Sequence, residues 1–305
     1  MLLKFAIEDF LDDREFKNVT KPTLDTYKVI FKQFSHYVSE QGVVNVEDIT
    51  PNLMKKYFVY CSKELGNNVV SVNAKIRRLR AFMNYMVEEE VISKSPMEKI
   101  QQSKEDIRIN VFTNYHIKQM LKYYRKIQQR EKEFWAYRDH TIILFLLGTG
   151  VRLNEMCNTK WSDIDFKEHH LIVFGKARMT QTIPLAEKLV KELSAYKLYC
   201  ETYFGEVNEY VFTNIRNKRM TDEAVKNVFK RLKTIMNFRD VRLSAHTFRH
   251  TFAHRCLMSG MDVFTLQKLM RHNSLNTTQK YLALWGHDLR KQSEKYNPLN
   301  TMDIF

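Results

Sequence analysis

The chain has 305 residues, of which 44% are hydrophobic and 28% are charged, a composition typical of folded proteins rather than disordered ones. Lysine and arginine number 49 against 35 aspartate and glutamate, and the net charge of +14 favours a polyanionic partner such as nucleic acid. The longest apolar run, Ile142–Gly148, is far shorter than the roughly 20 residues that cross a bilayer. The first residues turn acidic too early for a signal peptide, and the cysteines form no Cys-x-x-Cys pair, so we expect a cytoplasmic protein with no membrane segment.

The first hundred residues are predicted to be helical almost throughout. Glycine and proline are scarce, at 8 and 5 residues, which favours long helices over many short strands. Thr50 and Pro51 mark a helix start, because a threonine hydroxyl caps free N–H groups and proline is tolerated in the first turn. An early helix is predicted from apolar residues that recur at helical spacing, namely Leu24, Tyr27, Phe31, Phe34 and Val38.

A later helix in this region carries a dense group of cations: Lys75, Arg77, Arg78 and Arg80. Two interpretations stay open. The cations form a solvated surface, as most such charges do, or they lie against a phosphate backbone.

A polar stretch without apolar periodicity, Gln101–Asn110, follows the break at Ser93–Pro96. We therefore predict a helical first domain over residues 1–100, a linker over 101–111, a second domain over 112–290 and a C-terminal tail over 291–305.

The second domain is predicted to be helical with one small hairpin. Thr113 caps a helix, and Tyr137–Leu147 forms a strongly apolar one. Leu171–Phe174 and Gln181–Ile183 are strand-like runs around a glycine-containing turn, and a further short strand is expected near Tyr210–Phe212. The fold class is therefore mainly α with a small β-hairpin (α+β).

Two cations of the second domain sit where phosphate chemistry would need them. Arg152 follows a Gly-Thr-Gly break at the head of a helix, beside N–H groups that attract anions, and Glu155 lies on the same helical face. An ordinary surface ion pair is the alternative. Lys176 is at the tip of the hairpin, where a lysine can reach over a ligand as a proton donor or is merely solvated.

His246 and Arg249 are three residues apart on one helical face, which suits a phosphate site. His246, His250 and His254 also share a spacing that could bind a metal, but the neighbouring arginine and the lack of an acidic ligand argue against one, so no metal is predicted. His272 follows an apolar helix, and Tyr281, one of 15 tyrosines, follows a threonine pair.

The order of these residues, Arg, Lys, His-x-x-Arg, His and Tyr, resembles the tyrosine recombinase (phage integrase) family, most closely its Xer-type and transposon or phage integrase branch. The segments GVRLNEMCNTKWSDID, GKARMTQTIPL, HTFRHTFA and HNSLNTTQKY are similar to the arginine box, lysine hairpin, His-x-x-Arg box and nucleophile segment of that family. The resemblance implies a helical core-binding, SAM-like domain and a catalytic domain that together form a C-shaped clamp on DNA.

The resemblance also implies a reaction. Tyr281 would attack the scissile phosphate and form a 3′-phosphotyrosyl bond, which conserves the phosphodiester energy, so no cofactor is expected. Arg152 and Arg249 would hold the non-bridging oxygens. The other implied roles are proton transfer to the leaving oxygen by Lys176, proton transfer at the tyrosine by His246, a hydrogen bond to the phosphate from His272, and bracing by Glu155.

The sequence departs from the family pattern in two places. Arg271 stands where glycine usually precedes the last histidine, so either a left-handed backbone there displaces His272 or Arg271 adds a DNA contact. The hairpin keeps only Arg178 beside Lys176 as a cation, so its contacts with DNA are expected to be weaker.

The predicted function is a site-specific recombinase or integrase that acts on double-stranded DNA as a homo-oligomer, from dimer to tetramer, with the tail passed between subunits or simply frayed. A DNA-binding regulator that keeps the fold without recombining DNA is the main alternative. A relaxing enzyme of the topoisomerase kind is a third.

Overall fold

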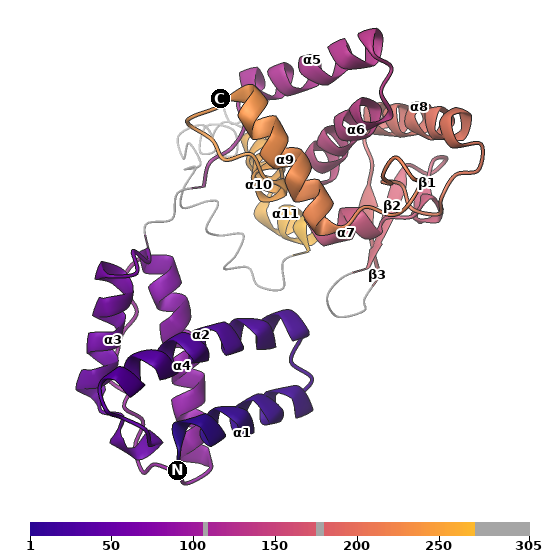
Figure 1. Cartoon of the computed structure of the whole chain (residues 1–305). Helices are drawn as coiled ribbons and strands as arrows, with labels where there is room; N and C mark the ends of the chain where they lie inside the picture. Colours follow the sequence, from indigo (N-terminus) through magenta and orange to yellow (C-terminus); the bar gives the residue numbers. More distant parts are fainter. Residues whose placement is uncertain (106–108, 175–179, 272–305) are drawn as a thin grey trace, which may run out of the picture. The chain divides into compact units, whose positions relative to one another are not determined.

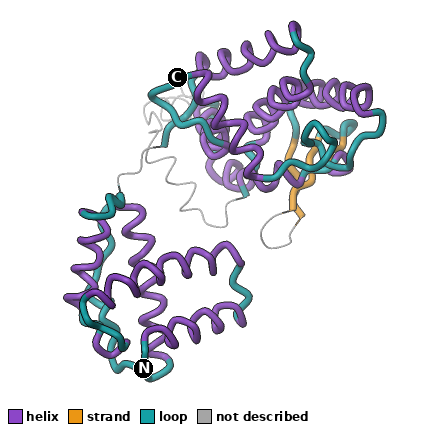
Figure 2. The backbone as a smooth tube through the Cα atoms, viewed as in Figure 1, coloured by secondary structure: helices purple, strands orange, loops and turns teal. Residues whose placement is uncertain are grey.

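The computed structural model describes residues 1–105, 109–174 and 180–271. It is mainly helical, and its strands belong to one small sheet (Figures 1 and 2). The mainly α fold class with a small hairpin is thus confirmed. Within the described ranges, none of the helices combines the length and the apolar character needed to cross a bilayer.

The chain divides into two compact units, Met1–Ile107 and Arg108–Phe305. Each has its own buried hydrophobic cluster. The division falls inside the stretch predicted as a linker. The part of that stretch before the division is nevertheless attached to the first unit, because the Asn73 side chain bonds both the N–H and the carbonyl of Ser103.

The first unit packs its helices around a group of aromatic rings. The ring of Phe10 lies 5.2–5.6 Å from those of Tyr27, Phe31, Phe82 and Tyr85, each pair edge to face, which is a favoured geometry for aromatic rings. The elements are α1 (Leu3–Phe16), α2 (Lys21–Glu40), the 3₁₀ turn η1 (Val46–Asp48), α3 (Pro51–Lys63) and α4 (Val69–Glu88). The predicted start at Thr50 is confirmed, since its hydroxyl accepts a bond from the Leu53 N–H.

The second unit begins with long helices and a short sheet. Its elements are α5 (Asn114–Arg130), α6 (Phe134–Thr149), α7 (Leu153–Asn158), the 3₁₀ turn η2 (Trp161–Asp163), β1 (Ile164–Asp165), β2 (His170–Phe174), β3 (Thr180–Pro184), α8 (Glu187–Phe204), α9 (Asp222–Met236), α10 (Ala245–Met258) and α11 (Val263–Met270). Thr113 caps α5, as predicted.

The sheet has the antiparallel order β1-β2-β3, in which Leu171 pairs with Ile183 and Phe174 with Thr180. The predicted hairpin is therefore confirmed. The strand expected near Tyr210–Phe212 is wrong: Tyr210 forms only an isolated bridge with Lys160, because η2 follows at once and leaves no extended partner beyond it.

Helix α6 is the centre of the second unit and is buried on nearly all sides. It packs against α5, α8 and α10, and its Phe145 ring contacts Phe212 in the segment between α8 and α9. A helix buried all round is held rigidly by its neighbours. Its C-terminal end is therefore a firm base for the turn that leads into α7.

Candidate active site

The turn between α6 and α7 depends on Gly150. Its φ of +60° is left-handed, and a Cβ there would lie 2.4 Å from the Phe252 ring, so only glycine fits without displacing that ring. The sharp turn ends α6 and places Arg152 at the N-cap of α7. The Gly-Thr-Gly break therefore places Arg152 at a helix head, as predicted.

Glu155 is paired with Arg152 inside the protein rather than on its surface. One carboxylate oxygen accepts from Arg152 Nη1 at 2.7 Å and the other from the Arg152 backbone N–H at 2.7 Å. The Glu155 side chain is only 7% exposed, against 35% for Arg152. Burial by itself would raise the pKa of Glu155, but the charge of Arg271 and the hydrogen bonds and charge of Arg152 lower it overall, so the carboxylate stays ionised.

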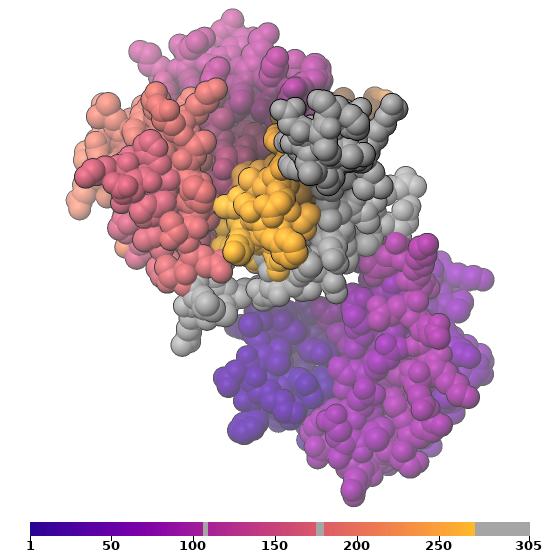
Figure 3. All heavy atoms as spheres, turned by 180° about the vertical axis from the view of Figure 1, so that it is seen from behind, coloured from indigo at the N-terminus to yellow at the C-terminus, as the bar shows by residue number. Residues whose placement is uncertain are grey.

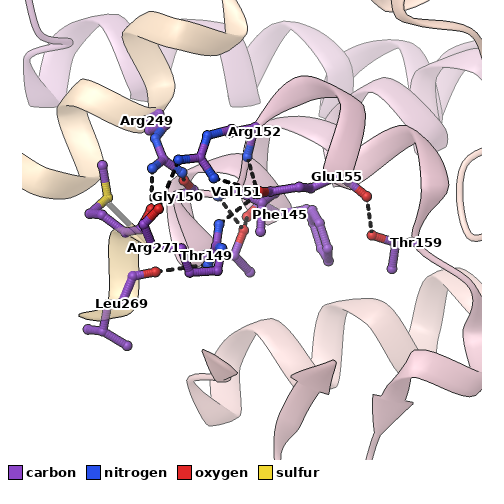
Figure 4. A network of polar contacts seen from close by, with 11 residues as sticks. Phe145, Thr149, Gly150, Val151, Arg152, Glu155, Thr159, Arg249, Leu269 and Arg271 are labelled. Atoms are coloured by element: carbon purple, nitrogen blue, oxygen red, sulfur yellow. Dashed lines mark hydrogen bonds and ion pairs between the residues drawn. The ribbon is translucent and has the colours of Figure 1, made fainter. Parts of the chain in front are cut away.

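Arg249 reaches the same turn from α10. Its Nη1 donates to the Gly150 carbonyl at 2.6 Å, and its Nη2 donates to the Met270 carbonyl. Arg152 Nη2 donates at 3.0 Å to the next carbonyl, that of Arg271. The two guanidinium groups thus donate hydrogen bonds to consecutive backbone carbonyls, those of Met270 and Arg271, at the end of α11 (Figure 4).

The position that differs from the family pattern, Arg271, does adopt the left-handed conformation, with φ 52° and ψ 48°. Its side chain is 4% exposed and forms an ion pair with Glu155 at 2.7 Å. The interpretation of Arg271 as a DNA contact is therefore wrong, because its guanidinium is buried in the protein and already paired.

His246 lies in the first turn of α10, close to both arginines. Partial desolvation lowers the pKa of His246, and the charges of Arg249, Arg152 and Arg242 lower it further. The imidazole is therefore neutral at physiological pH and able to accept a proton. Its ring is 4.2 Å from that of His250, but no cluster of three metal-binding side chains occurs in the part of the chain that is described.

Among the described residues, this cluster carries more positive than negative charge. The guanidinium groups of Arg152 and Arg271 pair with the carboxylate of Glu155, and that of Arg249 is bonded to backbone carbonyls of the same cluster. An arginine fork bonds two oxygens of one anion at fixed geometry. The arrangement is suited to a phosphate group that approaches the exposed side of Arg152.

Four predicted residues, Lys176, Arg178, His272 and Tyr281, lie outside the described residues. The structure therefore tests neither their positions nor their roles. It does describe the elements to which their segments are attached: β2 and β3 flank the first pair, and α11 precedes the second. Helix α11 forms part of the surface of the second unit (Figure 3).

The basic helix of the first unit is α4, and one of its four cations is not on the surface. Lys75 is buried, donates to Gln33 Oε1 and to Cys61 Sγ at 3.4 Å, and lies 5.9 Å from the centre of the Tyr57 ring. Its proposed contact with DNA is therefore wrong, because the ammonium group is enclosed by the packing of α4 on α2 and α3.

The three arginines of α4 are accessible. Arg77 is exposed, whereas Arg78 and Arg80 are partly exposed. Arg77 bonds Gln102, and Arg80 donates to the Ile100 carbonyl, so both also hold the segment that follows α4. Their contact with phosphates stays a prediction.

Comparison with known proteins gives the family. The phage integrase family pattern matches residues 110–286, and the phage integrase SAM-like domain matches residues 2–107. The chain belongs to the phage integrase family. The resemblance predicted from the ordered motifs is confirmed.

Relatives of the family cover most of the chain. The tyrosine recombinase XerC of Leptospira interrogans is 26% identical over 92% of this chain and 89% of its own length. That of Caldanaerobacter subterraneus is 30% identical over 86% of this chain and 72% of its own. The predicted enzyme class, a tyrosine-type recombinase, is therefore confirmed.

Solved structures of the family share the fold. The Tn1549 transposon integrase in complex with transposon right end DNA matches with a TM-score of 0.79 and 20% identity, over 97% of this chain and 99% of that one. A lambda integrase dimer bound to a COC′ core site matches with a TM-score of 0.74 and 18% identity, over 94% and 79% of the two chains.

Some contacts of the site could not be predicted from the sequence. The carbonyls of Gly150 and Met270 as acceptors for Arg249 were not predicted, and neither was the pairing of Arg271 with Glu155. A backbone carbonyl carries no sequence pattern, and the paired side chains are 116 residues apart. The Gly-Thr-Gly break was the one available indication that the α6–α7 turn has special geometry.

Proposed function

We propose that the chain is a site-specific recombinase that cleaves and rejoins double-stranded DNA through a 3′-phosphotyrosyl bond to Tyr281. The observation that carries the proposal is the convergence of Arg152 and Arg249 on one turn, beside a neutral His246. Two guanidinium groups fixed by the fold match the non-bridging oxygens of one phosphodiester.

The proposed reaction exchanges the phosphodiester bond for a phosphotyrosyl bond. The Tyr281 oxygen attacks phosphorus while its proton passes to His246, and the bond from phosphorus to the 5′ oxygen breaks. Lys176 protonates that oxygen, and His272 donates a hydrogen bond to the phosphate. A free 5′ hydroxyl then attacks the phosphotyrosine in the reverse sense, which restores the phosphodiester without an energy source.

Arg152 and Arg249 stabilise the charge of the pentacoordinate transition state. They are hydrogen-bonded before the substrate arrives, so little reorganisation is needed during the reaction. Loss of one such preorganised donor typically slows catalysis about 100- to 1000-fold.

The DNA-binding part of the proposal rests on charge and family. Arg77, Arg78 and Arg80 on α4 and Arg178 on the hairpin would contact phosphates. The protomers would assemble on DNA as a dimer to tetramer, with residues 291–305 exchanged between subunits, and the protein would act in the cytoplasm. Structural neighbours that are an integrase in complex with transposon DNA and an integrase dimer bound to a core site support DNA as the partner and a dimer as one assembly.

The test is covalent capture from a pool of nicked duplexes with randomised arms. Cleavage near the nick releases a short strand, so religation stops and the adduct accumulates. We expect an adduct that resists denaturant, is lost in Tyr281→Phe and is kept in Tyr115→Phe, a control at an exposed tyrosine.

Two other outcomes would each favour an alternative. Tight, salt-sensitive binding without any adduct would indicate a regulator. Relaxation of supercoiled plasmid regardless of its sequence would indicate a topoisomerase-like enzyme.

A further inference from the structure

The backbone at the end of α11 is strained for the residue it carries. Arg271 has φ 52° and ψ 48°, and its N–H closes the helix by donating to the Lys268 carbonyl at 3.0 Å. A residue with a Cβ in this conformation costs roughly 1–2 kcal/mol, whereas glycine adopts it freely. An arginine at this point therefore needs compensation from its side chain.

Both terminal nitrogens of Arg271 are hydrogen-bonded within the protein. Nη2 donates to Glu155 Oε2 at 2.7 Å and Nη1 donates to the Leu269 carbonyl at 2.8 Å. Both side chains of the ion pair are nearly buried, at 4% and 7% exposed. This pair is shielded from solvent, so water and salt screen the attraction between its two charges less than at a surface.

Arg152, Glu155 and Arg271 form a closed ring of hydrogen bonds. Arg152 Nη1 bonds Glu155, and Arg152 Nη2 bonds the backbone carbonyl of Arg271, whose side chain returns to Glu155 (Figure 4). Both acceptors of the Arg152 guanidinium are thus positioned by Arg271, one through its side chain and one through its own carbonyl.

We infer that Arg271 is a positioning residue for catalysis, which orients the Arg152 guanidinium toward the scissile phosphate by fixing Glu155 and the carbonyl at the end of α11. The inference rests on the proposed function, because it assigns Arg152 to phosphate. Arg271 itself is not assigned a contact with substrate, since its side chain is only 4% exposed and is already paired with Glu155.

Replacing Arg271 by glycine separates positioning from stability. The change removes the ion pair but also relieves the backbone strain, and Glu155 keeps Arg152 as a partner, so no buried charge is left alone. The fold is therefore expected to persist while Arg152 loses its alignment.

The experiment measures two quantities on a nicked duplex recovered by covalent capture. Single-turnover cleavage reports the alignment of Arg152, and DNA affinity across a salt series counts phosphate contacts. For Arg271→Gly we expect cleavage about 10- to 100-fold slower, by analogy with the loss of supporting contacts at other sites, with unchanged affinity and salt slope. Arg271→Lys should restore part of the rate.

A matched control changes another left-handed helix end. Asn237 ends α9 with φ 49°, and within the described ranges no hydrogen bond or ion pair joins it to Arg152, Glu155 or Arg271, so Asn237→Gly should leave cleavage unchanged. A double change with Glu155→Gln tests the route of the effect: if Arg271 acts through Glu155, the two losses are less than additive.

Each contrary result has its own meaning. Weaker binding with a salt slope reduced by about one would show that Arg271 contacts a phosphate. Cleavage at the wild-type rate, or strictly additive losses in the double variant, would overturn the inference alone. If the wild-type protein forms no adduct, the proposed function fails and the inference fails with it.

Discussion

His246 differs from the arginines around it in that its charge can change near neutral pH. Desolvation and the charges of Arg249, Arg152 and Arg242 all disfavour its protonated form. The proposed proton acceptor is therefore ready for use at pH 7, because the folded protein holds it neutral.

The rate of cleavage should depend on pH through the protonation of His246. A lowered pKa means that His246 becomes protonated only below its ordinary value of about 6.5, so the single-turnover rate should fall with a midpoint below that pH. Removing a positive neighbour with Arg242→Gln should move the midpoint upward. Cleavage whose acidic limb is unchanged in Arg242→Gln would contradict proton transfer through His246.

At the scale of elements, the α6–α7 turn connects the most buried helix of the second unit to the site. Gly150 contributes its carbonyl to Arg249 and its left-handed φ to the turn. An added methyl group there meets the Phe252 ring as well as an unfavourable backbone region.

Gly150→Ala should therefore destabilise the second unit by about 3 kcal/mol or more, since backbone strain and overpacking add. Gly260→Ala is the control in the same unit: its φ is also positive, at +92°, but nothing lies within 4 Å of its added Cβ. Denaturant unfolding can be followed by tryptophan fluorescence, because Trp135, Trp161 and Trp285 all belong to the second unit. Equal losses in the two variants would show that the Phe252 contact is unimportant.

Features that depend on neighbouring residues were predictable from the sequence. The caps at Thr50 and Thr113, the hairpin and the placement of Arg152 at a helix head all follow from local chemistry. The strand near Tyr210 was not, because strand formation needs a partner whose length the local sequence does not specify.

Features of tertiary packing were not predictable. Lys75 lies beside three accessible arginines in the sequence, yet its own direction on α4 points it at Gln33 and Cys61. The burial of Arg271 likewise depends on a carboxylate from a distant helix. The motif order identified which residues belong to the site, while the carbonyls that hold them came only from the fold.

At the scale of the whole molecule, the net charge of +14 is the property that DNA binding should use. In the proposed DNA contact, the first unit would use the cations of α4, of which Arg77 and Arg78 are accessible and Lys75 is not. Each phosphate contact that is lost lowers the salt slope of binding by about 0.9.

Arg77→Gln with Arg78→Gln should therefore weaken binding to a captured duplex and reduce its salt slope by roughly two. Lys75→Met is the control, because it removes a charge from the same helix without removing an accessible one, and its slope should stay at the wild-type value. An equal reduction in slope for Lys75→Met would contradict the assignment of that lysine to the core.

The most direct measurement of the central claim is the chemical identity of the protein–DNA bond. A nicked duplex recovered by capture is trapped on the protein, both components are digested, and the nucleotide-bearing peptide is sequenced by mass spectrometry. A 3′-phosphate on Tyr281 is the expected result. A nucleotide on another tyrosine, or a link through a 5′-phosphate, would contradict the proposed reaction.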